Sequence, residues 1–272
     1  MGEVITFTSG KGGVGKTTTT ANVGVGLSLF DKKVVLVDTD IGLRNLDVVM
    51  GLENRILYNL VDILKGKCRM RQALIRDKRY PNLSMIPSSC VKEREVLDIA
   101  QMKALIKSLR EEFDYILIDS PAGIEQGFQL SLCDTDRAVV VTTPQIAAIH
   151  DADRVLQLIR REKIQEINLV VNNYRKRMVK DGDMLDVKDI SELLETEPIG
   201  VIPEDPQIII TQNHGTPVIG QHLASEKYFL EIVKHLMGEE AKEAAAPKKA
   251  RFFSSFFVHR ESKDPLSSGG VK

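Results

Sequence analysis

Short runs of apolar residues recur along the chain and alternate with longer amphipathic stretches. Most of the runs are continuous rather than alternating, which predicts strands buried on both faces, as in a parallel sheet. The amphipathic stretches have helical spacing, for example over residues 16–30, 93–112 and 151–162. The pattern therefore predicts an α/β fold with a mainly parallel sheet and helices on both faces. The expected strands are residues 4–8, 34–38, 83–86, 115–119, 138–142, 167–172 and 199–202.

The alternating pattern ends near residue 238. Because no linker-like stretch interrupts it earlier, residues 1–238 are expected to form a single domain. Residues 239–247 are acidic and alanine-rich and contain Pro247, which is typical of a linker. Residues 261–272 are polar, contain Gly269 and Gly270, and are expected to form a disordered tail.

The segment between linker and tail, residues 248–260, is both basic and aromatic. Its side chains of interest are Lys248, Lys249, Arg251, Phe252, Phe253, Phe256 and Phe257, with Arg260 at its end. At ~100° per residue the four rings lie on one face of a helix, which predicts an amphipathic membrane-targeting helix for an anionic membrane surface. Two alternatives are a helix docked on the protein's own core and a nucleic-acid-binding segment. The acidic linker argues against the first, and the cost of exposing clustered rings argues against the second.

Net charge, cysteine content and the length of the apolar runs argue against several classes of protein. The formal net charge of -1 gives no overall attraction to nucleic acid. The three cysteines, Cys68, Cys90 and Cys133, are scattered, which argues against disulfides and for a reducing compartment. No apolar run approaches the ~18 residues of a membrane-spanning helix, and the first residues do not have the pattern of a signal peptide. A cytoplasmic protein is therefore expected.

Residues 10–17, with the sequence GKGGVGKT, match the phosphate-binding pattern G-x-x-x-x-G-K-[ST]. A predicted strand precedes the motif and a predicted helix follows it, and four of its first six residues are glycine, which argues against a chance glycine-rich turn. Glycines allow backbone N–H groups to surround phosphate oxygens, and the helix N-terminus adds free donors. Lys16 is expected to contact the β- and γ-phosphates of a nucleoside triphosphate, and Thr17 to offer its hydroxyl to Mg²⁺.

Lys11 is an additional lysine at the start of the loop. From its outer position it does not easily reach the phosphates of its own loop. It is either a solvated charge or a residue that crosses a dimer interface to the partner's nucleotide, as an arginine finger does.

Aspartates follow two of the predicted strands. Asp38 ends the second strand and Asp40 lies two residues beyond it, and Asp119 ends the fourth. A carboxylate that faces the P-loop from a strand end can hold Mg²⁺ directly or through water, although a single aspartate there is more often a turn or helix cap. Two such strand ends favour metal and water chemistry, with Asp119 near Mg²⁺ and Asp40 orienting water. For Asp38 a ligand role and a supporting role both stay open.

Several further motifs identify a family. They are DTDIGLRNLD at residues 38–47, DSPAGIE at 119–125, HDADR at 150–154, IPED at 202–205 and NHG at 213–215. With the P-loop they resemble the MinD family, the septum site-determining members of the deviant-Walker-A P-loop ATPases. The resemblance covers roughly residues 2–260 and is specific, because residues 41–50 are more particular than any P-loop alone.

The resemblance implies a single P-loop ATPase domain that uses ATP and Mg²⁺ and forms a homodimer with the nucleotides between the subunits. Lys11 would then act across the dimer, with Lys16 and Asp40 as the other catalytic residues. Thr17, Asp40 and Asp119 would be the metal residues. Asn172 would face adenine, and the loop 203–205 would lie at the edge of the base. The nucleotide-binding residues would be Gly10, Lys11, Gly12, Gly13, Val14, Gly15, Lys16, Thr17, Thr18, Asn172, Pro203, Glu204 and Asp205.

As to its role in the cell, the resemblance implies that the protein is an ATPase at the cytoplasmic face of the cell membrane. It would recruit a MinC-like division inhibitor, block septation at wrong sites and leave the membrane after hydrolysis. Asp151 and Asp153 fall in the region where the family binds MinC and MinE, so a MinC-like partner and a MinE-like or other topological regulator are expected.

Two other classes compete with this interpretation. A ParA-like partitioning ATPase would bind DNA and needs basic residues on its folded body, whereas here positive charge is concentrated at 248–260. Nucleic-acid binding is therefore not expected. A redox iron–sulfur ATPase needs two cysteines at a dimer axis, but glycine-containing cluster loops around Cys90 and Cys133 are missing.

Overall fold

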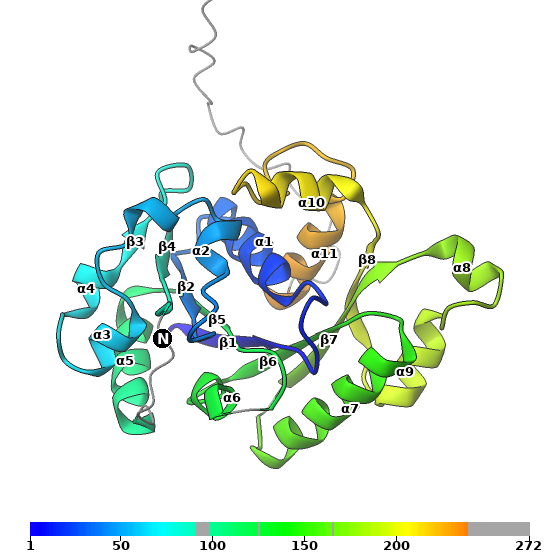
Figure 1. Ribbon diagram of the computed structural model, residues 1–272, viewed down its shortest axis with the longest axis horizontal. Helices are drawn as coiled ribbons and strands as arrows, with labels where there is room; N and C mark the ends of the chain where they lie inside the picture. Colours follow the sequence, from blue (N-terminus) through cyan, green and yellow to red (C-terminus); the bar gives the residue numbers. More distant parts are fainter. Residues whose placement is uncertain (91–97, 125, 165, 239–272) are drawn as a thin grey trace, which may run out of the picture. The chain divides into compact units, whose positions relative to one another are not determined.

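A mainly parallel sheet runs through the computed structural model, which describes residues 1–90, 98–124, 126–164 and 166–238 (Figure 1). Within these residues the sheet has eight strands in the order β3-β4-β2-β5-β1-β6-β7-β8. Only the pairing of β3 with β4 is antiparallel. The strands are β1 (Glu3–Thr8), β2 (Val34–Asp38), β3 (Ile75–Arg76), β4 (Leu83–Ile86), β5 (Tyr115–Asp119), β6 (Arg137–Thr142), β7 (Glu166–Tyr174) and β8 (Pro198–Pro203).

Helices cover both faces of the sheet, as the alternation of elements predicted. The longest are α1 (Lys16–Leu29), α5 (Ile99–Glu112), α7 (Ile146–Arg161) and α11 (Glu226–Leu236). The others are α2 (Leu46–Val49), η1 (Glu53–Arg55), α3 (Leu60–Leu64), α4 (Met70–Ala73), α6 (Gln126–Ser131), α8 (Lys176–Lys180), α9 (Val187–Leu194) and α10 (Pro206–Asn213).

Side chains that alternate along each strand divide the core into layers. Ile5 and Phe7 of β1 pack in one cluster with α1 and α11, whereas Val4 packs in a second cluster with α5. A third cluster joins β6 and β7 to α7 and α9. Both faces of the central strands are thus buried, which explains why their sequences are continuous apolar runs. All seven predicted strands are confirmed, and β3 is an additional strand at the edge.

Two helix starts differ from the sequence pattern. Helix α5 begins at Ile99 because the Asp98 carboxylate accepts the backbone N–H of Ala100 at 2.8 Å and caps the helix. The predicted start at residue 93 falls in 91–97, outside the described residues. Helix α7 begins at Ile146, five residues before the predicted start, because Ala148 and Ile149 already belong to its buried stripe.

The predicted linker, membrane-targeting segment and tail, residues 239–272, lie outside the described residues. In the part of the chain that is described, no helix combines the length and the apolar character needed to cross a membrane.

Candidate nucleotide-binding site

Three neighbouring strands bring the predicted site residues to one edge of the sheet. Strands β2, β5 and β1 are adjacent, and Asp38 pairs in register with Asp119. Phe7 of β1 pairs with Asp119 on its other side. Because the strands are parallel, their carboxyl ends meet where the P-loop leaves β1, which is where ligands bind in such sheets.

The P-loop has the conformation of a phosphate cradle. Gly13 and Gly15 have φ of 79° and 92°, a left-handed backbone that glycine adopts without strain. At Gly15 a side chain has no room either, since a Cβ would lie 2.1 Å from Nδ2 of Asn172. Among the described residues, no acceptor takes a hydrogen bond from the backbone N–H groups of residues 11–15. These donors and the N-terminus of α1 are therefore available to phosphate oxygens.

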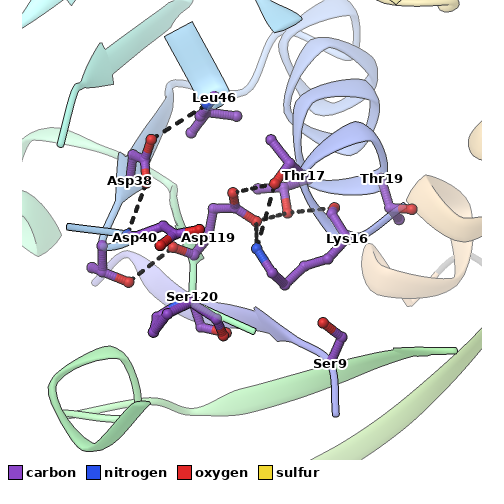
Figure 2. Close-up of polar contacts among 12 residues, drawn as sticks. Ser9, Lys16, Thr17, Thr19, Asp38, Asp40, Leu46, Asp119 and Ser120 are labelled. Carbon is purple, nitrogen blue, oxygen red and sulfur yellow. Dashed lines mark hydrogen bonds and ion pairs between the residues drawn. The ribbon is translucent and has the colours of Figure 1, made fainter. Parts of the chain in front are cut away.

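A buried ion pair lies directly beneath this loop (Figure 2). Lys16 Nζ donates to Asp119 Oδ1 at 2.8 Å, and the two side chains are only 7% and 1% exposed. Thr17 Oγ1 donates to the other carboxylate oxygen, Oδ2, at 2.7 Å. The phosphate lysine, the metal hydroxyl and the strand-end carboxylate predicted from sequence are thus in direct contact.

One further residue of this centre escaped the sequence analysis. Thr20 Oγ1 has two acceptors for its single proton, Asp119 Oδ1 at 3.1 Å and the Lys16 carbonyl oxygen at 3.0 Å. Thr20 lies four residues after Lys16 and therefore on the same face of α1. The spacing from Lys16 indicates that Thr20 faces the site. Residues 17–20 are all threonine, however, so the sequence does not single out the one besides Thr17 that contacts Asp119.

Asp38 supports the loop that carries Asp40. Its carboxylate accepts the backbone N–H of Asp40 at 2.9 Å and that of Leu46 at 3.3 Å (Figure 2). Complete burial and the neighbouring Asp119 carboxylate raise the pKa of Asp38 from 3.8 to about 8, because both disfavour its ionised form. Of the two roles left open by the sequence, this geometry favours support, since the carboxylate binds backbone at both ends of residues 39–46.

The raised pKa predicts how stability depends on pH. Between pH 3.8 and about 8, Asp38 is ionised in the unfolded chain and protonated in the folded protein. Folding then takes up a proton, so the unfolding free energy of the nucleotide-free protein falls as pH rises through this window. Asp38→Asn should make that decline shallower and raise the thermal midpoint at pH 7.5, which calorimetry from pH 5 to 8.5 will measure. The exposed acid variant Asp183→Asn is the control, and identical slopes in wild type and Asp38→Asn contradict the assignment.

The residues expected around the base lie next to the P-loop and at the end of β7. Asn172 Nδ2 donates to the Val14 carbonyl oxygen at 2.8 Å, so its amide braces the loop in this structure. Pro203 pairs with Tyr174, and the Glu204 carboxylate forms an ion pair with Arg175 at 2.5 Å. Asp205 caps α10 by accepting the backbone N–H of Gln207 at 2.9 Å.

Lys11 lies in the phosphate loop, and Asp151, one of the two aspartates predicted to bind partners, packs against the first residue of that loop. The Lys11 side chain is exposed. Gly10 packs against α7 so closely that a Cβ would lie 2.3 Å from the Asp151 carbonyl group. Asp153 lies on α7 as well and accepts a hydrogen bond from Gln157 at 2.8 Å. The structure therefore joins the helix that carries Asp151 and Asp153 to the first residue of the phosphate loop.

The Thr17 hydroxyl and the Asp119 carboxylate beside the P-loop fit a Mg²⁺ ion bound together with a nucleotide. A hydroxyl and a carboxylate are oxygen donors of the kind that Mg²⁺ prefers. In the described chain no cluster of three or more His, Cys, Asp or Glu side chains has the arrangement of a metal site.

The comparisons with known proteins agree with one another on the family. A family model described as an AAA domain matches residues 2–173. The septum site-determining protein MinD of Bacillus subtilis is 47% identical over 243 residues, which cover 88% of this chain and 90% of that protein.

Two solved structures share the fold along nearly their whole length. The MinC:MinD cell division complex of Aquifex aeolicus contains a chain with 42% identity and a TM-score of 0.82, covering 88% of this chain and 97% of that one. The septum site-determining protein MinD of Pyrococcus horikoshii, complexed with Mg-ADP, has 28% identity and a TM-score of 0.79, covering 89% of this chain and 100% of that one. The metal predicted from sequence, and an adenine nucleotide in its diphosphate form, are thus present in a structural relative.

Proposed function

The chain belongs to the MinD family of septum site-determining P-loop ATPases, and from this premise we propose that it is an ATP-driven membrane switch. It binds Mg·ATP, dimerises, attaches to the membrane and recruits a MinC-like inhibitor that blocks septation at wrong sites. Hydrolysis to ADP and phosphate releases it. The observation that carries the proposal is the contact of Asp119 with both Lys16 and Thr17 beneath the free N–H groups of the P-loop.

The phosphate chain is held by residues 10–18. The N–H groups of Gly10, Lys11, Gly12, Gly13, Val14 and Gly15 surround phosphate oxygens, Lys16 neutralises the terminal phosphates and the Thr18 hydroxyl adds a donor. Thr17, Asp119 and, through water, Asp40 hold Mg²⁺, which when bound neutralises charge that develops on the phosphates. Asn172 and the loop Pro203, Glu204 and Asp205 face the adenine.

Asp40 orients the water that attacks the terminal phosphate. Its carboxylate accepts a hydrogen bond from that water, and its backbone N–H is held by Asp38 at 2.9 Å. A fixed backbone keeps the carboxylate in one position, which supports catalysis by orientation. Asp38 therefore serves the reaction through the loop rather than through the substrate.

Dimerisation places Lys11 of one subunit at the nucleotide of the other. The side chain is exposed at the rim of its own P-loop, whereas Lys16 already occupies the inner position beside Asp119. A cation that reaches the phosphates from the partner subunit stabilises the charge of the transition state.

Partner proteins bind the dimer at α7 through Asp151 and Asp153. A MinC-like inhibitor and a MinE-like or other topological regulator both use this surface. The close packing of Gly10 on Asp151 supports the assignment, because a partner bound at this part of α7 would lie beside the phosphate loop. Nucleic acid is not a partner, since the net charge of -1 gives no basic body.

Membrane attachment rests on residues 248–260 as an amphipathic helix at the cytoplasmic face of the cell membrane. A phenylalanine contributes roughly 1.5–3 kcal/mol when it is fully buried, but partial burial at the interface and the ordering of the segment reduce the sum for four rings to several kcal/mol at most. Lys248, Lys249 and Arg251 add about 1 kcal/mol each near an anionic surface. One segment therefore binds weakly, and two segments in an ATP dimer raise the apparent affinity ~100-fold or more.

The test is sedimentation of the full chain with anionic liposomes in the presence of ATP, ADP or no nucleotide. Wild type is expected to sediment with ATP and to stay mostly in the supernatant otherwise. Phe256→Glu should retain ATP binding and dimerisation but lose sedimentation, because it replaces a ring on the apolar face. Ser254→Glu adds the same charge without removing a ring and should lose less.

Two results decide against this account. Equal sedimentation with ATP and ADP, while dimers form only with ATP, contradicts the switch and leaves a constitutive anchor. Binding of the same protein to DNA but not to liposomes favours a partitioning ATPase.

A further inference from the structure

Helix α10 is attached to the domain with little burial. None of its residues is buried, and Ile209 and Ile210 are 63% and 45% exposed. The helix nevertheless begins at its cap Asp205, which belongs to the loop proposed to face the base. In Figure 1 it lies at the top of the view, above α1, to which Gln212 is hydrogen-bonded. Ile208 is partly buried against the main core cluster, so the orientation of α10 depends on this apolar contact together with a few polar contacts.

The segment that follows α10 is anchored firmly. The Asn22 side chain, 1% exposed in α1, accepts the backbone N–H of Ile219 at 3.0 Å and donates to the Thr18 carbonyl oxygen at 2.8 Å. Arg79 donates to the Gly215 carbonyl oxygen at 2.9 Å. Gly51 and Gly215 touch so closely that a Cβ on Gly215 would lie 2.6 Å from Cα of Gly51. The chain is thus held firmly just after the C-terminal end of α10.

Gln212 connects the helix itself to the phosphate-binding helix. Thr18 Oγ1 donates to Gln212 Oε1 at 3.2 Å. In the described chain this is the sole side-chain hydrogen bond between α10 and α1. A separation of 3.2 Å is long for an O–H···O bond, so the contact is easily exchanged.

A threonine hydroxyl has one proton to donate. If that proton goes to a phosphate oxygen, it no longer goes to Gln212, and the charged phosphate is the stronger acceptor. The carboxamide of Gln212 can then reverse and donate its own N–H to the free lone pair of Thr18 Oγ1. Glutamine can make both arrangements, whereas a carboxylate can only accept.

We propose that Gln212 is a positioning residue that couples phosphate binding at Thr18 to the placement of α10 and its base-facing loop. Gln212 therefore contributes to the affinity for the base of a purine nucleoside triphosphate and not to the affinity for its phosphate chain. This inference rests on the proposed binding of Mg·ATP at the P-loop.

The experiment compares two ligands by titration calorimetry with Mg²⁺. ATP carries a base, and inorganic tripolyphosphate occupies the phosphate cradle without one. Gln212→Ala should weaken ATP binding about tenfold, the value of one hydrogen bond and the ordering it provides. Its affinity for tripolyphosphate should stay within about twofold, because α10 contributes to the base end alone.

Two further variants sharpen the comparison. Gln212→Glu should bind ATP more weakly than Gln212→Ala, because its carboxylate competes with phosphate for the Thr18 proton. In a Thr18→Val background, Gln212→Ala should have no further effect on ATP binding, since the coupled partner is absent. Gln207→Ala, an exposed residue of the same helix, is the matched control and should bind both ligands as wild type does.

The outcomes separate this inference from the proposed function. Wild-type affinity of Gln212→Ala for ATP, or equal losses for ATP and tripolyphosphate, overturns the positioning role and leaves the P-loop assignment intact. Additive losses for Thr18→Val and Gln212→Ala overturn the coupling between them. Failure of the wild-type protein to bind either ligand overturns both proposals.

Discussion

Lys16→Ala is expected to lower the affinity for ATP by a factor of about 10² to 10³, the effect of removing one charged partner from a buried, hydrogen-bonded pair. Lys16 is the inner cation of the P-loop, and its Nζ lies 2.8 Å from Asp119 with both side chains almost fully buried. No other described lysine or arginine pairs with Asp119. Alanine at this position removes the charge that would face the terminal phosphates.

The same substitution also destabilises the nucleotide-free fold. Without Lys16, the Asp119 carboxylate is buried beside Thr17 and Thr20 with no cation, which costs about 3–5 kcal/mol when one partner of a buried pair is removed. Loss of ATP binding by an unfolded chain would say nothing about the site. A second variant, Lys16→Ala with Asp119→Asn, removes the unpaired charge and should regain most of the lost thermal midpoint without regaining ATP binding.

Calorimetric titration with ATP and thermal unfolding of both variants provide the measurements. Because Asp119 is itself proposed to hold Mg²⁺, the double variant tests stability alone, and a recovered thermal midpoint assigns the destabilisation to the unpaired Asp119 charge. The loss of ATP binding is assigned to Lys16 from the single variant, titrated at a temperature at which it is still folded. If the single variant binds ATP with wild-type affinity, Lys16 is not part of the nucleotide site and its role is confined to the ion pair with Asp119.

Much of the fold could be predicted from the sequence because the central strands are buried on both faces. Strands β1, β2 and β5 have continuous apolar sequences, and the polar residues that end them, from the P-loop to Asp119, lie at the ligand-binding edge. The antiparallel strand β3 has only two residues, too few for a periodic pattern. Helix α10 has no buried stripe, so its attachment to α1 through Gln212 has no counterpart in hydrophobic spacing.

The raised pKa of Asp38 also could not be predicted from the sequence. Its raised pKa arises from burial and from Asp119, a residue 81 positions later that the parallel register of β2 and β5 places opposite it. A sequence motif records that both aspartates are present but not that they share one desolvated edge. The contact of Lys16 with Asp119 has the same origin, since it also depends on the order of strands in the sheet.

Lys11→Ala and Asp40→Ala are expected to stop ATP hydrolysis at two different steps. If Lys11 crosses the dimer interface, its removal should abolish ATP-induced dimerisation and reduce turnover by about 10³-fold or more, the effect of losing a cation supplied by the partner subunit. Binding of ATP to the monomer should persist, because Lys16 and Asp119 are untouched. Asp40→Ala should dimerise with ATP but lose about 10²- to 10⁴-fold in turnover, because the attacking water has no acceptor.

Light scattering with ATP and phosphate release together separate these two phenotypes. Lys107→Ala provides the matched control, since it removes an equally exposed lysine from α5, the helix that covers the sheet face opposite α1. The hydrogen bond from the Asp40 backbone N–H to Asp38 does not depend on the Asp40 side chain and is retained in Asp40→Ala. A Lys11→Ala protein that dimerises and hydrolyses ATP at the wild-type rate makes Lys11 a solvated loop charge. An Asp40→Ala protein that stays monomeric with ATP would instead assign the aspartate to assembly, because orienting a water molecule is not needed for two subunits to associate.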